Sequence, residues 1–388
     1  MLNSFSKFDQ FGFYLVNGFK TYSKVEALEI SDQTNQPVQW VFNDVEFSTY
    51  DWTKEPAESL PELYASRAKQ IREDYDHIVI FYSGGADSGN VVDSFVDNGI
   101  PFEEIATYNY WKLDSRENSF LHGEQVKVSY PRINELKDQG VDFLHRPIDL
   151  SEIAYEIFKD QFWNTHRAYY GNNHWGTTHL AKSYLREKID DYRKIIDSGK
   201  RLVFVWGSEK PRVVFHNEDN HYYFKFIDAI DSGFSPRSQL LARPYEHDEL
   251  FYHSPKCFKL LCKQGHTIMN FFKHHKQMQL ENLYVGDHKL PNIDFMFSNQ
   301  GTEDGLSYRN LLNWLIYPKF NFQMFTMGKP WSSVYSLRDQ YWIKDSVFVQ
   351  QIDNLATHLS HLDQKWWRDK NDISKGLVLM LSRGYLLG

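Results

Sequence analysis

The stretch that decides the fold is HIVIFYSGGADS, from His77 to Ser88. Its first part, Ile78 to Tyr82, is rich in β-branched and aromatic side chains, which is typical of a strand buried on both faces. The residues from Asn90 to Val96 have helical spacing. The two glycines therefore lie between the carboxyl end of a strand and the N-terminus of a helix, where unpaired backbone N–H groups attract anions. The sequence predicts a phosphate-binding loop.

The residue types in this loop suit a polyphosphate. Gly84 and Gly85 let the backbone approach a ligand without a Cβ in the way. Ser83 and Ser88 supply hydroxyl donors, and Asp87 is a carboxylate placed where a hard cation bridging phosphates needs one. No Lys follows the glycines, as the Walker pattern requires, and the dinucleotide pattern GxGxxG is also absent. The loop therefore belongs to neither of these two classes.

The order Ser83-Gly84-Gly85-Ala86-Asp87-Ser88 resembles the SGGxDS signature of the PP-loop ATP pyrophosphatase superfamily. The pattern is most similar to the synthetase domain of asparagine synthetase-like enzymes, and the likeness covers about residues 65–240. The resemblance implies an α/β fold with a parallel, doubly wound sheet of the adenine nucleotide alpha hydrolase-like (HUP) kind. It also implies an enzyme that splits ATP between its α and β phosphates, passes AMP to an acceptor oxygen and releases pyrophosphate.

A second segment whose residues could take part in catalysis or binding is Gly207 to Arg212, GSEKPR. It follows an apolar strand expected over residues 201–206. In asparagine synthetase and its relatives the corresponding strand ends in a glycine-rich loop whose acid faces the SGGxDS loop, and Glu209 resembles that acid. Lys210 and Arg212 would add positive charge beside the leaving pyrophosphate. A surface turn of charged residues is the alternative interpretation.

The resemblance implies ATP and Mg²⁺ as cofactors and assigns roles to residues of both segments. The nucleotide would be held by Ser83, Gly84, Gly85, Asp87, Ser88 and Gly207. The metal ligands would be Asp87 and Glu209, since Mg²⁺ prefers oxygen ligands. The catalytic residues would be Asp87, Lys210 and Arg212.

We expect three regions along the chain. Residues 1–65 form a small β-rich N-terminal region with a lead-in helix, residues 66–240 form the PP-loop domain, and residues 241–388 form a mostly helical, aromatic-rich substrate or partner domain. Strands are expected at 12–16, 38–42, 104–110, 141–146 and 201–206. Helices are expected at 59–75, 131–140, 177–198, 256–276 and 308–314.

Composition limits the function classes. A net charge of −8 over 388 residues gives no general attraction for polyanions. The two cysteines, Cys257 and Cys262, exclude a disulfide framework and fit a reducing compartment. The first 18 residues lack the basic start and apolar core of a signal peptide, and no apolar run has the length of a membrane span. We therefore expect a cytoplasmic protein without a membrane partner.

Absent motifs narrow the expected activity to an ATP-dependent ligase that joins a small-molecule acceptor to an amine or ammonia. Leu2 stands where an N-terminal-nucleophile glutaminase needs Cys, so no built-in glutaminase is expected. Two alternatives stay open. One is a nucleic-acid base or tRNA modifying enzyme that uses the same adenylation, with the C-terminal aromatic residues as a stacking platform. The other is a non-catalytic nucleotide-binding protein. The acceptor and a homo-oligomeric state are also left open.

Overall fold

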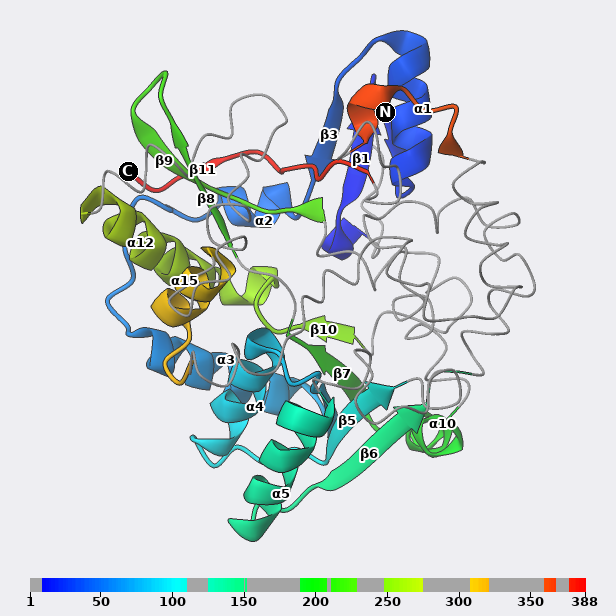
Figure 1. Ribbon diagram of the computed structural model, residues 1–388, viewed down its shortest axis with the longest axis vertical. Coiled ribbons are helices and arrows are strands. Elements are labelled where there is room, and N and C mark those ends of the chain that lie inside the picture. Colours follow the sequence, from blue (N-terminus) through cyan, green and yellow to red (C-terminus); the bar gives the residue numbers. More distant parts are fainter. Residues whose placement is uncertain are drawn as a thin grey trace.

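The computed structural model describes residues 9–109, 125–149, 151, 189–207, 211–228, 248–274, 308–320, 359–367 and 377–388. Its main element is a five-stranded parallel sheet flanked by helices (Figure 1). The strands are β4 (His77–Phe81), β5 (Glu104–Asn109), β6 (Leu144–Asp149), β7 (Leu202–Trp206) and β10 (Asp248–Leu250). The predicted α/β class with a parallel sheet is therefore confirmed.

The strand order is β10-β7-β4-β5-β6, with β4 in the middle. Numbered along the chain, the five strands are arranged 3-2-1-4-5 from β6 to β10. The chain moves outward from β4 to β5 and β6, and then returns to the other edge of β4 to form β7. This reversal makes a topological switch point between β4 and β7, and open α/β sheets bind ligands outside the carboxyl ends of the strands at such a point. Both segments predicted to bind phosphate follow these two strands.

Helices cover both faces of the sheet (Figure 1). The helices α3 (Leu60–Asp74), α4 (Ala86–Val96) and α5 (Tyr130–Asp138), the last preceded by η2 (Gln125–Ser129), lie along one face. The helix α3 starts with a capping box, because Ser59 accepts from the backbone of Glu62 while the Glu62 carboxylate accepts from the backbone of Ser59. The opposite face is covered by α10 (Asp190–Asp197), whose Tyr192 ring lies 5.0 Å from that of Phe204.

The N-terminal region departs from the predicted series of strands and turns. Its antiparallel strands β1 (Phe13–Val16), β2 (Phe19–Thr21) and β3 (Val38–Val41) follow η1 (Asp9–Phe11), and the predicted Asn17–Gly18 turn has positive φ at both residues. However, α1 (Lys24–Thr34) and α2 (Asp44–Ser48) are helices that the pattern did not predict. Buried polar residues, Lys24 and Ser31, interrupt the apolar stripe that would have indicated α1.

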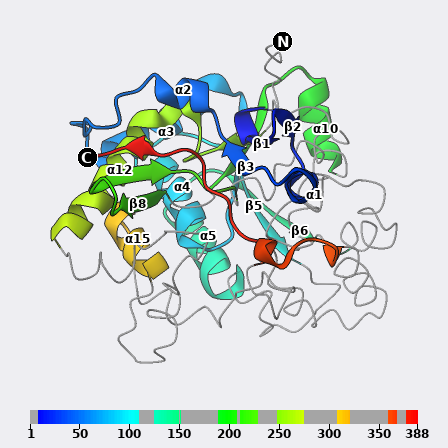
Figure 2. The same cartoon turned by 90° about the horizontal axis from the view of Figure 1, so that it is seen from above.

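A third sheet brings the C-terminal segment beside the middle of the chain. Its antiparallel order is β11 (Tyr385–Leu386), β9 (His221–Lys225) and β8 (Arg212–His216). Figure 2 shows the C-terminal segment running from the N-terminal strands towards β8. The helix α12 (Phe258–His274), which follows η6 (Pro255–Cys257), packs on this sheet, and α15 (Tyr308–Ile316) packs on α12. A further short helix among the described residues is η8 (Gln364–Trp366).

The third parallel strand begins and ends three residues later than predicted. It was expected over residues 141–146 and is observed as β6 over Leu144–Asp149, so the strand continues through Pro147. Proline is tolerated there because β6 is an edge strand, whose outer side needs no ladder partner. Of the helix expected over 177–198, residues 177–188 lie outside the described residues and the rest contains α10.

Most of the buried apolar residues that the structure describes form one continuous cluster that reaches from Tyr14 to Leu387. The expected boundary at 240/241 falls between described segments that end at residue 228 and resume at 248, and β10 beyond it is a strand of the main sheet. The division into three domains stays a prediction. Among the residues described, no helix has the length and apolar character needed to cross a bilayer.

A buried ion pair joins the N-terminal region to the third sheet. The Lys24 ammonium donates to Oδ2 of Asp228 at 2.5 Å, and the two side chains are 0% and 1% exposed. The Tyr14 hydroxyl donates to the same carboxylate at 3.0 Å, as does the backbone N–H of Met380. Lys24 also donates to the carbonyl of Val378. Because the carboxylate accepts several hydrogen bonds, the charge of Asp228 is well compensated in this apolar setting.

Candidate functional site

The loop between β4 and α4 is a compact turn held together by its own serines. Gly84 has φ +89°, a left-handed conformation that glycine adopts without strain. The Ser83 hydroxyl accepts from the backbone N–H of Gly85 at 3.2 Å and lies 3.1 Å from the Ser88 hydroxyl. The backbone N–H of Ser83 donates to the Ser88 hydroxyl at 3.2 Å. The serine hydroxyls thus fix the shape of the loop, in addition to the donor role predicted for them.

The N-terminus of α4 suits an anion. Gly85 occupies the N-cap position and has no side chain with which to cap the helix. The first backbone N–H groups of a helix have no partner within the helix, and the helix dipole adds a partial positive charge at that end. The loop places these groups at the carboxyl edge of β4, beside the switch point. The residues present therefore fit a phosphate group.

Gly207 brings the second predicted segment against the first. A Cβ at this position would lie 2.8 Å from the carbonyl oxygen of Asp87 and 2.9 Å from the Cα of Ser88. The end of β7 is therefore in direct contact with the first turn of α4, as expected if both segments border one site. Of the residues that follow, Ser208, Glu209 and Lys210 lie outside the described residues, so the roles expected for Glu209 and Lys210 stay predictions.

Two aromatic rings lie at the carboxyl ends of the central strands. Phe81 of β4 and Trp206 of β7 are register partners, and their rings stack with centroids 3.9 Å apart. The indole N–H of Trp206 donates to Asp248 of β10 at 3.0 Å. Both rings are buried, so they join the ends of the two strands rigidly. This stack fixes the separation between the segments that follow β4 and β7.

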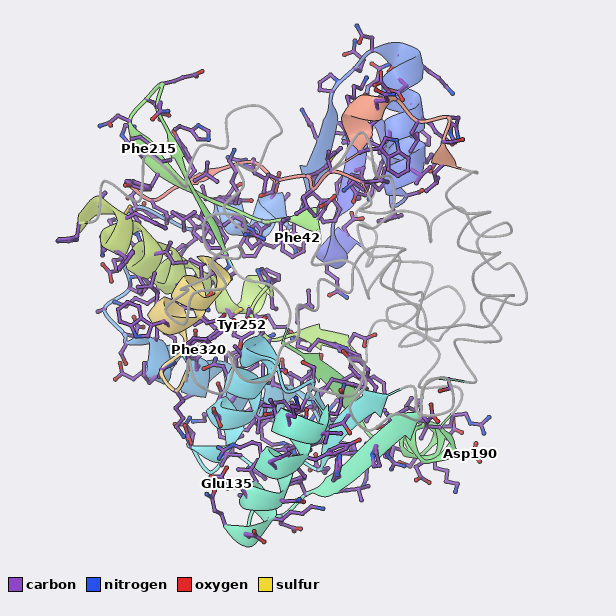
Figure 3. The ribbon with its side chains drawn as sticks, viewed as in Figure 1. Phe42, Glu135, Asp190, Phe215, Tyr252 and Phe320 are labelled. Carbon is purple, nitrogen blue, oxygen red and sulfur yellow. The ribbon has the colours of Figure 1, made fainter. Side chains whose placement is uncertain are left out.

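Two buried tyrosines hold Asp87 from the C-terminal part of the chain. The Tyr317 hydroxyl donates to Oδ1 of Asp87 at 2.5 Å, and the Tyr252 hydroxyl donates to the Asp87 carbonyl at 2.7 Å. In Figure 3, Tyr252 lies between α15 and α4. Burial, together with the nearby Asp87 carboxylate, raises the pKa of each phenol well above its ordinary value, so both remain protonated donors. Asn90 of α4 completes this network by donating to the Tyr252 hydroxyl at 3.1 Å.

Sequence reasoning missed both tyrosines, which lie 165 and 230 residues after Asp87. Their local contexts, LFYHS and LIYPK, look like ordinary core sequence, and no nearby residue indicates a partner in the loop. The sequence feature related to these tyrosines was the high aromatic content of the C-terminal region. That content suggests aromatic packing and does not identify which hydroxyl meets a carboxylate.

Arg212 lies at the start of β8, opposite Lys225 of β9. No hydrogen bond or ion pair among the described residues joins Arg212 to the loop from Ser83 to Ser88. Its Nε is buried without a hydrogen-bond partner in the described part of the chain. The structure therefore places Arg212 five residues beyond the contact of Gly207 with α4, and its expected role beside pyrophosphate stays a prediction.

Of the two acids predicted to bind magnesium, only Asp87 is among the described residues. Asp87 offers a carboxylate at the loop, with one oxygen engaged by Tyr317. Within the described ranges, no three His, Cys, Asp or Glu side chains gather as a metal site would require. Mg²⁺ commonly takes only one or two carboxylates together with substrate phosphates and water. Asp87 fits such a site, and the assignment of Asp87 and Glu209 as metal ligands stays a prediction.

Cys257 and Cys262 are both free and buried, as expected for core thiols. Burial raises the pKa of each thiol, to about 12 for Cys262, so neither is poised as a thiolate nucleophile.

No family model, no curated protein and no solved structure matches this chain.

Proposed function

We propose that the protein binds ATP at the switch point between β4 and β7, transfers the adenylyl group to an acceptor oxygen and releases pyrophosphate. The observation that carries this proposal is the contact of Gly207 with Asp87 and Ser88, which brings the end of β7 onto the SGGADS loop. The strand order 3-2-1-4-5 supports the HUP-like form of the fold that the motif implies. The motif and the topology point to the same edge of the sheet.

The chemistry follows from the resemblance. The acceptor oxygen attacks the α-phosphorus, the bond to the bridging oxygen breaks, and pyrophosphate leaves with the electron pair. An amine or ammonia then displaces AMP from the adenylated acceptor, loses a proton and leaves a new C–N bond. Catalysis of this kind depends mainly on positioning and on neutralising charge.

The residues of the chain would share these tasks. The first backbone N–H groups of α4 hold the polyphosphate, and Ser83 and Ser88 keep the loop in shape. Lys210 and Arg212 stabilise the negative charge that builds up on pyrophosphate. Asp87 and Glu209 would hold Mg²⁺, which when bound neutralises phosphate oxygens. Tyr252 and Tyr317 keep Asp87 in a fixed orientation.

A second candidate function is nucleotide binding without catalysis. The observation that favours it is the hydrogen bond from Tyr317 to Oδ1 of Asp87, because this contact engages the carboxylate that the resemblance assigns to the metal. In that case the loop and helix N-terminus hold ATP while the Asp87 side chain serves only to anchor the C-terminal part of the chain.

The decisive experiment incubates the full chain with ATP, Mg²⁺ and a pool of small carboxylates and amines, and follows AMP and pyrophosphate by chromatography. A parallel reaction supplies tRNA as the acceptor, and a salt series tests whether the chain retains it. We expect AMP and pyrophosphate in equal amounts. ATP binding without AMP in any reaction would favour the second candidate, and absence of ATP binding would overturn both.

Asp87→Ala provides the matched test of the site. We expect this substitution to abolish AMP formation while leaving a cooperative unfolding transition. Asp97→Ala is the control, since Asp97 follows the other end of the same helix and pairs with Lys319 at the surface. Unchanged turnover in Asp87→Ala would remove the loop from the proposed mechanism.

A further inference from the structure

The hairpin of β8 and β9 places two cations directly opposite each other. Arg212 is the register partner of Lys225. Side chains of directly opposed residues in an antiparallel pair lie on the same face, with Cβ atoms about 4.5–5.5 Å apart, and like charges in this arrangement repel. The described residues provide no carboxylate within ion-pair distance of either cation. Within the described residues, the pair therefore has no carboxylate as a counter-charge.

Partial burial makes this arrangement more costly. The Arg212 Nε is buried and finds no hydrogen-bond partner in the described part of the chain. Lys225 is partly buried as well, and burial lowers the pKa of its ammonium group. The next register pairs on the same face of the hairpin are Val214 with Tyr223 and His216 with His221, none of which carries a negative charge. A bound anion would satisfy both cations.

Both cations are connected to the candidate site by short stretches of chain. Arg212 is five residues after Gly207, which touches the first turn of α4, and five residues span at most about 18 Å. Lys225 precedes Phe226, whose ring lies 5.9 Å from that of His253. His253 follows Tyr252, the residue that donates to the Asp87 carbonyl. The open end of the hairpin is therefore adjacent in sequence to residues that contact the loop or the residues that hold it.

We infer that Arg212 and Lys225 act together as a clamp for one phosphate-bearing anion, and that this anion is the pyrophosphate released in the proposed reaction. The identity of the anion rests on the proposed function, whereas the clamp rests on the register of the hairpin. A guanidinium group offers two parallel N–H donors to phosphate oxygens, and an ammonium group adds a compact charge. Lys225 is the residue that this inference adds to the site, since the sequence analysis named Lys210 and Arg212 as the cations there.

The test measures binding of inorganic pyrophosphate to the full chain by calorimetry at constant ionic strength, without ATP. We expect Lys225→Met and Arg212→Gln each to weaken binding at least tenfold, and Lys225→Arg to restore most of it. Lys273→Met is the matched control, because Lys273 lies over the ring of Tyr222, whose side chain is on the other face of the same hairpin. That variant should bind pyrophosphate within twofold of the original chain.

A thermal measurement separates anion binding from a structural role. Without an anion, removing one of two opposed cations relieves repulsion, so Lys225→Met should melt at the same temperature as the original chain or higher. Added pyrophosphate should raise the melting temperature of the original chain and not that of the variant. A lower melting temperature for Lys225→Met with unchanged pyrophosphate affinity would overturn the clamp, as would a lack of pyrophosphate binding by the original chain.

The clamp and the proposed function can fail separately. Pyrophosphate binding that depends on Lys225, in a chain that never forms AMP, would support the clamp and refute the ligase. AMP formation by a Lys225→Met variant with unaltered inhibition by pyrophosphate would support the ligase and refute the clamp.

Discussion

The hydroxyl of Tyr317 lies 2.5 Å from Oδ1 of Asp87, so a residue just after α15 fixes the orientation of a carboxylate in the loop after β4. The two residues are 230 positions apart. Tyr317 is itself fixed, since its backbone N–H donates to Asn313 at 2.8 Å and its ring lies 5.7 Å from that of Tyr252. The C-terminal part of the chain is therefore a structural component of the candidate site.

Removing this hydroxyl should affect activity more than stability. Hydrogen bonds to charged groups contribute about 1.5–3 kcal/mol, so we expect Tyr317→Phe to reduce AMP formation roughly 10- to 100-fold if the orientation of Asp87 matters in the transition state. Tyr64→Phe is the control, because the Tyr64 hydroxyl is equally buried and donates to the Ile316 carbonyl at 2.6 Å without touching Asp87. Equal losses of activity in the two variants would show that packing, and not orientation, is responsible.

Two glycines at the loop should respond in opposite ways to alanine. Gly207→Ala would force backbone atoms of α4 to move, and we expect it to cost about 1–3 kcal/mol of unfolding free energy and to weaken ATP binding. Gly89→Ala should stabilise the protein by up to about 1 kcal/mol, since Gly89 lies inside α4 and its nearest neighbour would be 3.9 Å from the new Cβ. Urea unfolding and binding of a non-hydrolysable ATP analogue measure both effects. A tolerated Gly207→Ala would contradict the close contact.

The buried pair of Lys24 and Asp228 should behave as a coupled unit. Lys24→Met removes the cation from a buried carboxylate, and we expect a loss of about 3–5 kcal/mol in unfolding free energy. The double variant with Asp228→Asn should recover part of that loss, which a double-mutant cycle in urea would reveal. Strictly additive effects of the two substitutions would show that the charges do not interact.

Acidification should destabilise the fold through three partly buried histidines. Burial lowers the pKa of His77, His145 and His216 below the ordinary value of about 6.5. The folded state thus binds fewer protons than the unfolded state, so stability is complete above about pH 6.5 and falls as the pH drops towards the folded-state pKa values. We expect a lower unfolding free energy at pH 5.5 than at pH 7.5, and a smaller difference in His145→Gln. The same pH dependence in that variant would exclude a contribution from His145.

The central part of the fold could be predicted because its signals are local. The strands β4 and β7 are continuous apolar runs, and Ser59, Pro61 and Glu62 mark the start of α3 within four residues. The glycines after β4 predicted a turn before a helix, and the structure has one. Such signals depend on neighbours in the sequence, so the local structure of His77 to Ser88 can be predicted from that stretch alone.

The rest of the site depends on contacts between distant segments. Nothing near Tyr252, Tyr317 or Lys225 indicates its partner, because the register of a hairpin and the docking of a helix are set by the whole core. The helix α1 was missed for the same reason, since Lys24 is polar in the sequence and buried in the fold by a partner 204 residues away.

The contact of Lys24 with the Val378 carbonyl has a consequence for biosynthesis. The two residues are separated by 354 positions, which a ribosome adding 5–20 residues per second covers in roughly 20–70 s. Asp228 is made earlier in that interval, but the ammonium group of Lys24 has all of its partners only when Val378 has been added. Long-range contacts of this kind also slow folding after release. The region around Lys24 is therefore made early relative to the rest of the described fold and reaches its native surroundings late, so we expect chaperones to protect it in the interval.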